Sequence, residues 1–241
     1  MILLTSTLLI LTAGVSIPSV KATTTTTLFL YTTLGTSSVT ANGTALKEGA
    51  ENTLNSGNTY SFTATASSGW KFVCFVYAAK TGAVGSTKNP FSEVISAACS
   101  LEAVFIPTTN TTGTASGSGA ATITLFASGG GTTSPAGSTS GASVSATIGH
   151  STTITETPGT GYTFLCWVTQ CSSVSNYYTS TTLSYTVLTS GVAIEPIWVP
   201  TGSGITVPVI NEYSAAVVAF LAIALVASAL GAYAYTKKAK K

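Results

Sequence analysis

Four cysteines carry the most definite chemistry in this chain of 241 residues: Cys74, Cys99, Cys166 and Cys171. Thiols outside the cell oxidise to disulfides, and four cysteines allow three connectivities. The spacing favours Cys74–Cys99 and Cys166–Cys171, each pair within one domain. By loop entropy, closing a loop the size of the first is worth about 3 kcal/mol. Zinc sites use cysteines about two to four apart or nearby histidines. The chain lacks both patterns, so we expect no metal site.

Three further residues could serve acid–base chemistry, and each has a simpler interpretation. His150 is the only histidine and the chain contains no aspartate to orient it, so we expect a solvated histidine in a turn. Glu102 and Glu195 recur at matched positions and could form an acid pair, but we expect them in separate domains on a flexible linker. A glycosidase needs its two carboxyl groups at a fixed separation. There is no Gly-x-Ser-x-Gly motif and no phosphate-binding loop. The sequence therefore predicts a non-enzymatic protein without a catalytic residue or a cofactor.

Sites for glycans and partners are the remaining candidates. Asn42 and Asn110 each begin a glycosylation sequon, Asn42-Gly43-Thr44 and Asn110-Thr111-Thr112. Tyr177 and Tyr178 follow Cys171, and a tyrosine pair on a loop can stack on a sugar or anchor a partner. The alternative is one ring in the core and one at the surface.

These residues belong to two copies of one domain. Residues 69–76 align with residues 161–168 at an offset of 92, and residues 101–107 align with residues 194–200 at an offset of 93. Two matched blocks in the same order at nearly the same separation indicate a tandem repeat. The shared motif consists of Gly69, Trp70, Phe72 and Phe75 in the first copy, and of Gly161, Tyr162, Phe164 and Trp167 in the second.

Strands must position this motif, because β-branched and aromatic residues alternate with Gly, Ser and Asn clusters. In the first copy we expect strands at 26–31, 60–64, 71–77 and 101–106. In the second we expect them at 122–126, 143–148, 152–155, 162–168, 182–188 and 193–199. The predicted fold is all-β or β-rich: two tandem small antiparallel β domains, followed by a C-terminal transmembrane helix.

The repeat motif, Gly-aromatic-x-Phe-x-x-aromatic with a short β segment about 30 residues later, resembles the β-grasp-like repeats of microbial surface proteins. The internalin B-repeat and the Listeria–Bacteroides repeat are of this type. The second copy fills the pattern, whereas the first has Phe75 where Trp is usual, and Asn89-Pro90 also fits. The resemblance implies an adhesion or spacer role and brings no catalytic residue with it.

Both ends of the chain indicate export and anchoring. Residues 1–22 read as a signal peptide, with a retained N-terminal helix as the alternative. Residues 213–235 contain no charge and are long enough to cross a bilayer, and residues 236–241 form a basic tail. We expect a single-pass protein of the cell membrane with its ectodomain outside and its C-terminus in the cytoplasm. The short basic tail suggests an archaeal protein.

The expected order is repeat domain 1 (23–107), a Thr/Gly/Ser linker (108–121), repeat domain 2 (122–200) and a spacer (201–212). Residues 23–212 carry four lysines, seven glutamates and no arginine, which argues against nucleic acid as a partner.

The sequence thus predicts a membrane-anchored surface glycoprotein for adhesion or cell-envelope structure, whose partners are surface proteins or glycans. The alternatives are a filament or virion subunit and a carbohydrate-binding module. The sequence leaves the oligomeric state open.

Overall fold

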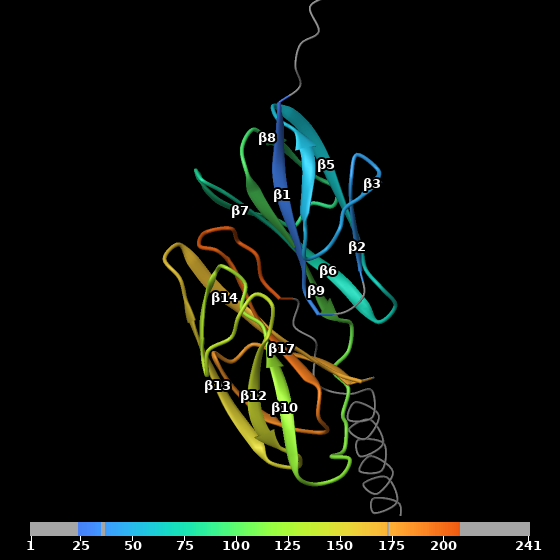
Figure 1. The fold of residues 1–241 in the computed structure, drawn as a ribbon, viewed down its shortest axis with the longest axis vertical. Helices are drawn as coiled ribbons and strands as arrows, with labels where there is room; N and C mark the ends of the chain where they lie inside the picture. The colour runs from blue at the N-terminus through green and yellow to red at the C-terminus, as the bar shows by residue number, and fades with distance from the viewer. Residues whose placement is uncertain (1–23, 35–36, 173, 208–241) are drawn as a thin grey trace, which may run out of the picture.

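The computed structural model describes residues 24–34, 37–172 and 174–207, and these residues form strands and no helix. Accordingly, no helix in the described part is long and apolar enough to cross a membrane. The predicted signal peptide, transmembrane segment and basic tail lie outside the described residues. Figure 1 shows two β domains arranged along the long axis of the molecule.

Domain 1 is a sandwich of two sheets. The five-stranded sheet has the order β4-β1-β9-β6-β7 and the four-stranded sheet the order β3-β2-β5-β8. The strands are β1 (Thr25–Thr32), β2 (Ser38–Ala41), β3 (Thr44–Ala45), β4 (Glu51–Asn55), β5 (Asn58–Thr65), β6 (Trp70–Ala79), β7 (Gly82–Ser86), β8 (Phe91–Ile95) and β9 (Cys99–Pro107). The core between the sheets is built around Leu28, Phe62, Phe75 and Phe105, which are at most 1% exposed.

Domain 2 repeats this plan. Its sheets have the orders β12-β10-β17-β14-β15 and β11-β13-β16. The strands are β10 (Ala120–Leu125), β11 (Gly131–Ser134), β12 (Ala142–Thr147), β13 (Ser151–Pro158), β14 (Tyr162–Cys171), β15 (Val174–Tyr178), β16 (Thr182–Thr186) and β17 (Val192–Pro200). Each five-stranded sheet has its first and last strands side by side at the centre, and the β3 ribbon has no counterpart among the described strands of domain 2. The two-copy prediction therefore agrees with the strand order.

One part of the predicted architecture needs correction, because neither large sheet is purely antiparallel. β1 pairs with β9 in parallel, and β10 pairs with β17 in parallel. Parallel neighbours require a crossover connection between them. Here the crossover is the rest of the domain, which passes through the second sheet before the last strand returns beside the first.

A β-bulge explains the spacing of the repeat motif. In a regular strand, residues three apart point to opposite faces. The register of β6 against β9 shifts between Phe72 and Cys74, so Phe72 and Phe75 both face the domain core, with ring centroids 4.8 Å apart. An equivalent shift lies between Phe164 and Cys166, and the Phe164 and Trp167 rings are 5.6 Å apart. The extra residue of the bulge thus turns Phe-x-x-aromatic into a pair that shares one face.

The segments on either side of domain 2 are held against the body of the protein. In the segment predicted as a flexible linker, Asn110 exchanges two hydrogen bonds with the backbone of Tyr177, at 2.9 and 3.1 Å. The Thr111 amide donates to Asn176 Oδ1 at 2.6 Å. In the predicted spacer, Ile205 is buried between the two domains, where the orange end of the ribbon lies in Figure 1. Both described segments therefore contact the folded domains, although residues 108–120 are themselves exposed to solvent.

Candidate functional site: the cleft between the two domains

The two domains share a third apolar cluster, formed by the outer faces of their large sheets. We call this contact the waist. Five of its buried residues come from β6 and β9, namely Val73, Cys74, Val76, Val104 and Ile106. Their counterparts Leu165, Cys166, Val168, Ile197 and Val199 come from β14 and β17. β7 lies against β17, and β15 lies against β9. Because equivalent strands make reciprocal contacts, the repeats meet through the same face of each.

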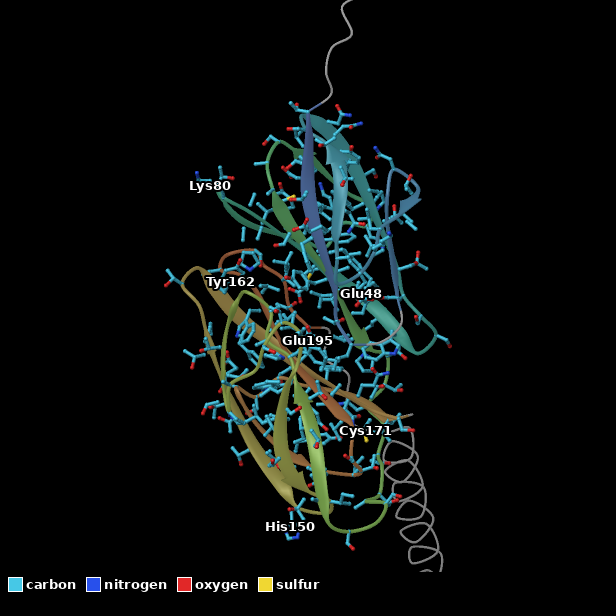
Figure 2. All side chains as sticks on the ribbon, in the orientation of Figure 1. Glu48, Lys80, His150, Tyr162, Cys171 and Glu195 are labelled. Atoms are coloured by element: carbon cyan, nitrogen blue, oxygen red, sulfur yellow. The ribbon has the colours of Figure 1, made fainter. Side chains whose placement is uncertain are left out.

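Glu102 and Glu195 are the charged residues buried at the waist, each only 8% exposed. They hold equivalent places in the sheets, since Glu102 is opposite Val76 and Glu195 is opposite Val168. The partner domain reaches each of them. The Leu34 amide of domain 1 donates to Glu195 Oε2 at 3.1 Å, and Ser128 of domain 2 hydrogen-bonds Glu102. Figure 2 shows Glu195 at the level where the domains meet.

Burial perturbs both carboxyl groups. Desolvation raises the pKa of Glu102 to about 7, and the hydrogen bond from Ser128 opposes the rise. Desolvation also holds the pKa of Glu195 well above its usual range, and the nearby Glu102 adds to this effect. Glu102 Oε1 is buried without a hydrogen-bond partner among the described residues. An uncharged carboxyl can both donate and accept hydrogen bonds. The Glu102 carboxyl group can therefore form a further hydrogen bond through Oε1.

Two cavities open beside these carboxyl groups. The larger, about 440 Å³, is lined by Glu195 and Glu48 together with the rings of Phe29, Tyr31 and Phe126. The smaller, about 270 Å³, is lined by Glu102, Ser128, Gly129, Tyr162 and Tyr31 among others. Tyr31 lines both cavities, and both are walled by residues of the two domains. Ligand sites are typically concave and aromatic with a few placed polar groups, which makes this cleft the candidate site.

The sequence argues against Glu102 and Glu195 as a pair, because it predicts a flexible linker between their domains. The structure instead brings both residues to one interface. Their matched positions in the repeat were the available signal. What sequence reasoning missed was that the face bearing them is not open to solvent.

The cysteine pairings need correction. All four cysteines are free thiols in the structure. Cys74 lies on the waist face of β6 opposite Val104, while Cys99 is opposite Ala79 and packs against the domain core. The two are therefore five strand positions apart, roughly 16 Å, and on opposite faces. A disulfide requires Cα atoms within about 7 Å.

The second predicted pair fails for the same reason. Cys166 and Cys171 lie on the single strand β14, with Cys166 at the waist and Cys171 in the core of domain 2. Burial, the first cause, raises the pKa of the Cys74 and Cys166 thiols well above the usual range, and neighbouring glutamates add to it. These thiols are protected inside the fold.

The other predicted positions are spread over the molecule. Tyr177 and Tyr178 lie on strand β15 and not on a loop; Tyr177 is buried at the waist and Tyr178 is partly buried against the core of domain 2. Asn42 sits in an exposed turn, where its Oδ1 accepts from the Ser61 amide at 2.8 Å. His150 lies at the far end of domain 2 (Figure 2), away from Glu195. None of these residues lines the cleft.

Among the residues that the structure describes, no group of three or more His, Cys, Asp or Glu side chains is placed to hold a metal ion.

Comparison with known proteins gives one match. Residues 121–201, which contain every described strand of domain 2 except Ala120 at the start of β10, match the family model of the divergent InlB B-repeat domain. No curated protein and no solved structure matches the chain. The match supports the repeat type expected from the motif, and a B-repeat domain indicates a surface or cell-envelope repeat protein.

Proposed function

We propose that this chain is a non-enzymatic, membrane-anchored surface protein, of archaeal type, in which two B-repeat-like domains form one rigid unit for adhesion or cell-envelope structure. The observation that carries the proposal is the B-repeat match over residues 121–201, in a domain whose strand order recurs in domain 1.

The waist supports the proposal that the two domains form one rigid unit. Interfaces between independently moving domains are usually polar. Here the contact contains a continuous cluster of residues at most 8% exposed, including Ile106, Cys166 and Ile197. The Asn110–Tyr177 hydrogen bonds also tie the connecting segment to domain 2. A rigid unit presents its outer ends at a fixed separation, which suits adhesion or spacing.

Anchoring is tested by removing residues 213–241 and expressing the shortened and full chains in the same exporting host. We expect the full chain in the membrane fraction, with Lys80 and Lys88 labelled by an impermeant amine reagent on intact cells. Both lysines are exposed in domain 1. The shortened chain should appear in the medium. Retention of the full chain in the soluble cell fraction, with both lysines protected, would refute the proposal.

A further inference from the structure

The cleft at the waist combines three features that suit a ligand-binding site. One is Glu102, a buried carboxyl group that lines the smaller cavity and whose Oε1 has no hydrogen-bond partner among the residues that the structure describes. The second is a set of aromatic walls, in which the Phe29 and Tyr31 ring centroids are 4.7 Å apart. The third is volume, about 440 Å³ in the larger cavity. Leaving a buried polar atom unpaired costs about 1–3 kcal/mol, so a group that supplies its partner would bind favourably.

From this arrangement we propose that the cleft binds a neutral polyhydroxylated ligand, a glycan unit. Tyr31 contributes to the wall of both cavities, and Glu102 and Glu195 are the hydrogen-bonding partners of the ligand. The aromatic walls pack against the apolar faces of a sugar ring. Side-chain hydroxyl groups in both cavities can exchange hydrogen bonds with the hydroxyl groups of the sugar. They belong to Ser128 in the smaller cavity and to Thr139 and Ser140 in the larger.

The charge of the cleft selects among ligand classes. Among the described residues, no lysine lines either cavity, so an anion would meet carboxyl groups with no positive charge to balance its own. An apolar ligand would leave Glu102 Oε1 unpaired. A cation requires ionised carboxylates, whereas desolvation raises the pKa of both Glu102 and Glu195 and favours their neutral forms. A neutral ligand with many hydroxyl groups satisfies the donors and acceptors without charging them.

Backbone geometry provides a blocking substitution. Gly129 lines the smaller cavity, and a Cβ built on it meets nothing within 4 Å and has no positive-φ strain. Gly129→Leu should therefore place a bulky side chain at the wall of the smaller cavity without a backbone clash, and Gly129→Ala is the matched control with a single methyl group. Tyr31→Ala removes the wall common to both cavities. Tyr60→Ala is its control, because Tyr60 is a partly buried tyrosine on β5, in the other sheet of domain 1.

The experiment measures saturation-transfer NMR and titration calorimetry on the purified full chain in a polyoxyethylene detergent, since sugar-based detergents would compete. The probes are neutral di- and trisaccharides of glucose, mannose and N-acetylglucosamine, with tetramethylammonium chloride as the cationic comparison. We expect at least one saccharide to bind, and Gly129→Leu and Tyr31→Ala to weaken its binding by about tenfold or more. The two controls should stay within about twofold of the unsubstituted chain.

Circular dichroism checks that each variant is folded. Three results would overturn the proposal: no saccharide binding at roughly 10 mM, saccharide binding that Gly129→Leu leaves unchanged, or binding of tetramethylammonium alone. The proposal depends on the waist and not on membrane anchoring. A chain that fails the localisation test could therefore still bind saccharide, and an anchored chain could fail to bind it.

Discussion

Glu102 shows how a single buried side chain couples the protein to pH. Its folded pKa, about 7, is raised above the ordinary value of 4.5. A raised carboxyl pKa means that the folded state resists ionisation. Stability is therefore full below about pH 4.5 and falls as the pH rises through about 7, by roughly 3 kcal/mol in total. An acidic exterior would keep the waist at its most stable.

The first prediction follows from this fall in stability with rising pH. Glu102→Gln keeps a neutral hydrogen-bonding group and removes the ionisation cost, so it should raise the melting temperature at pH 8 and change it little at pH 4. Thermal unfolding from pH 4 to 8 provides the measurement. Glu51→Gln, on the exposed end of edge strand β4, is the control and should shift both values equally. A Glu102→Gln variant that is less stable than the parent at pH 8 would contradict the prediction.

A second prediction concerns the thiols. Cys74 and Cys166 are fully buried, Cys171 is 3% exposed, and Cys99 is partly exposed. A small alkylating reagent should modify Cys99 first and the other three only after unfolding in denaturant. Peptide mass mapping of unreduced protein provides the readout. A mass gain of two hydrogens on reduction, located to any pair of these cysteines, would show a disulfide and refute the free-thiol arrangement.

At the scale of the strand, the bulge in β14 lets Phe164 and Trp167 face the core of domain 2 together, where their burial stabilises the fold. Trp167 is fully buried, packs beside Phe164, and its Nε1 donates to the Ser180 carbonyl at 2.9 Å. Trp167→Ala should cost about 3–5 kcal/mol of unfolding free energy. Trp167→Phe, which copies Phe75 of the first repeat, should cost clearly less. Denaturant melts of both variants make the comparison, and equal losses would mean that the ring does not fill the core as described.

The sequence predicted the long strands well, because their β-branched and aromatic runs are also their buried runs. β6 and β14 were each placed to within three residues. The strands that sequence reasoning missed are short or polar: β2, β3, β4, β7, β8, β11 and β15. The β7 sequence Gly82-Ala83-Val84-Gly85-Ser86 has little strand propensity; it is a strand because β6 pairs with it and β17 packs on it.

Local sequence pattern was also insufficient to predict the candidate site. Repetition in the sequence identified Glu102 and Glu195 as equivalent, but equivalence does not reveal contact. Their presence at one interface depends on the packing of β7 on β17 and of β15 on β9, which are long-range contacts between strands that local pattern does not specify. The disulfide pairings failed for a related reason, because spacing along the chain does not reveal which face of a strand a thiol occupies.

For the whole molecule, the waist predicts that the domains move as one body. Gly85 lies at this contact, and a Cβ there would stand 2.6 Å from Ile205 Cδ1. Gly85→Val should therefore push Ile205 and its segment away from β7 and loosen the waist, raising the radius of gyration in small-angle scattering. Val84→Ile is the control on the same strand, because Val84 is 50% exposed. Unchanged scattering for Gly85→Val would mean that Ile205 moves aside without loosening the waist, and would contradict the prediction.

The burial of Ile205 also bears on the orientation that an anchored protein would take. The described chain ends at Val207, beside the waist. If residues 213–235 cross the bilayer as proposed, five residues separate Val207 from the membrane segment, a reach of roughly 17 Å. A connection so short, attached near the middle of the molecule, would hold the long axis of the molecule along the lipid surface and not perpendicular to it. Its two ends would then point sideways, toward neighbouring molecules in the same membrane.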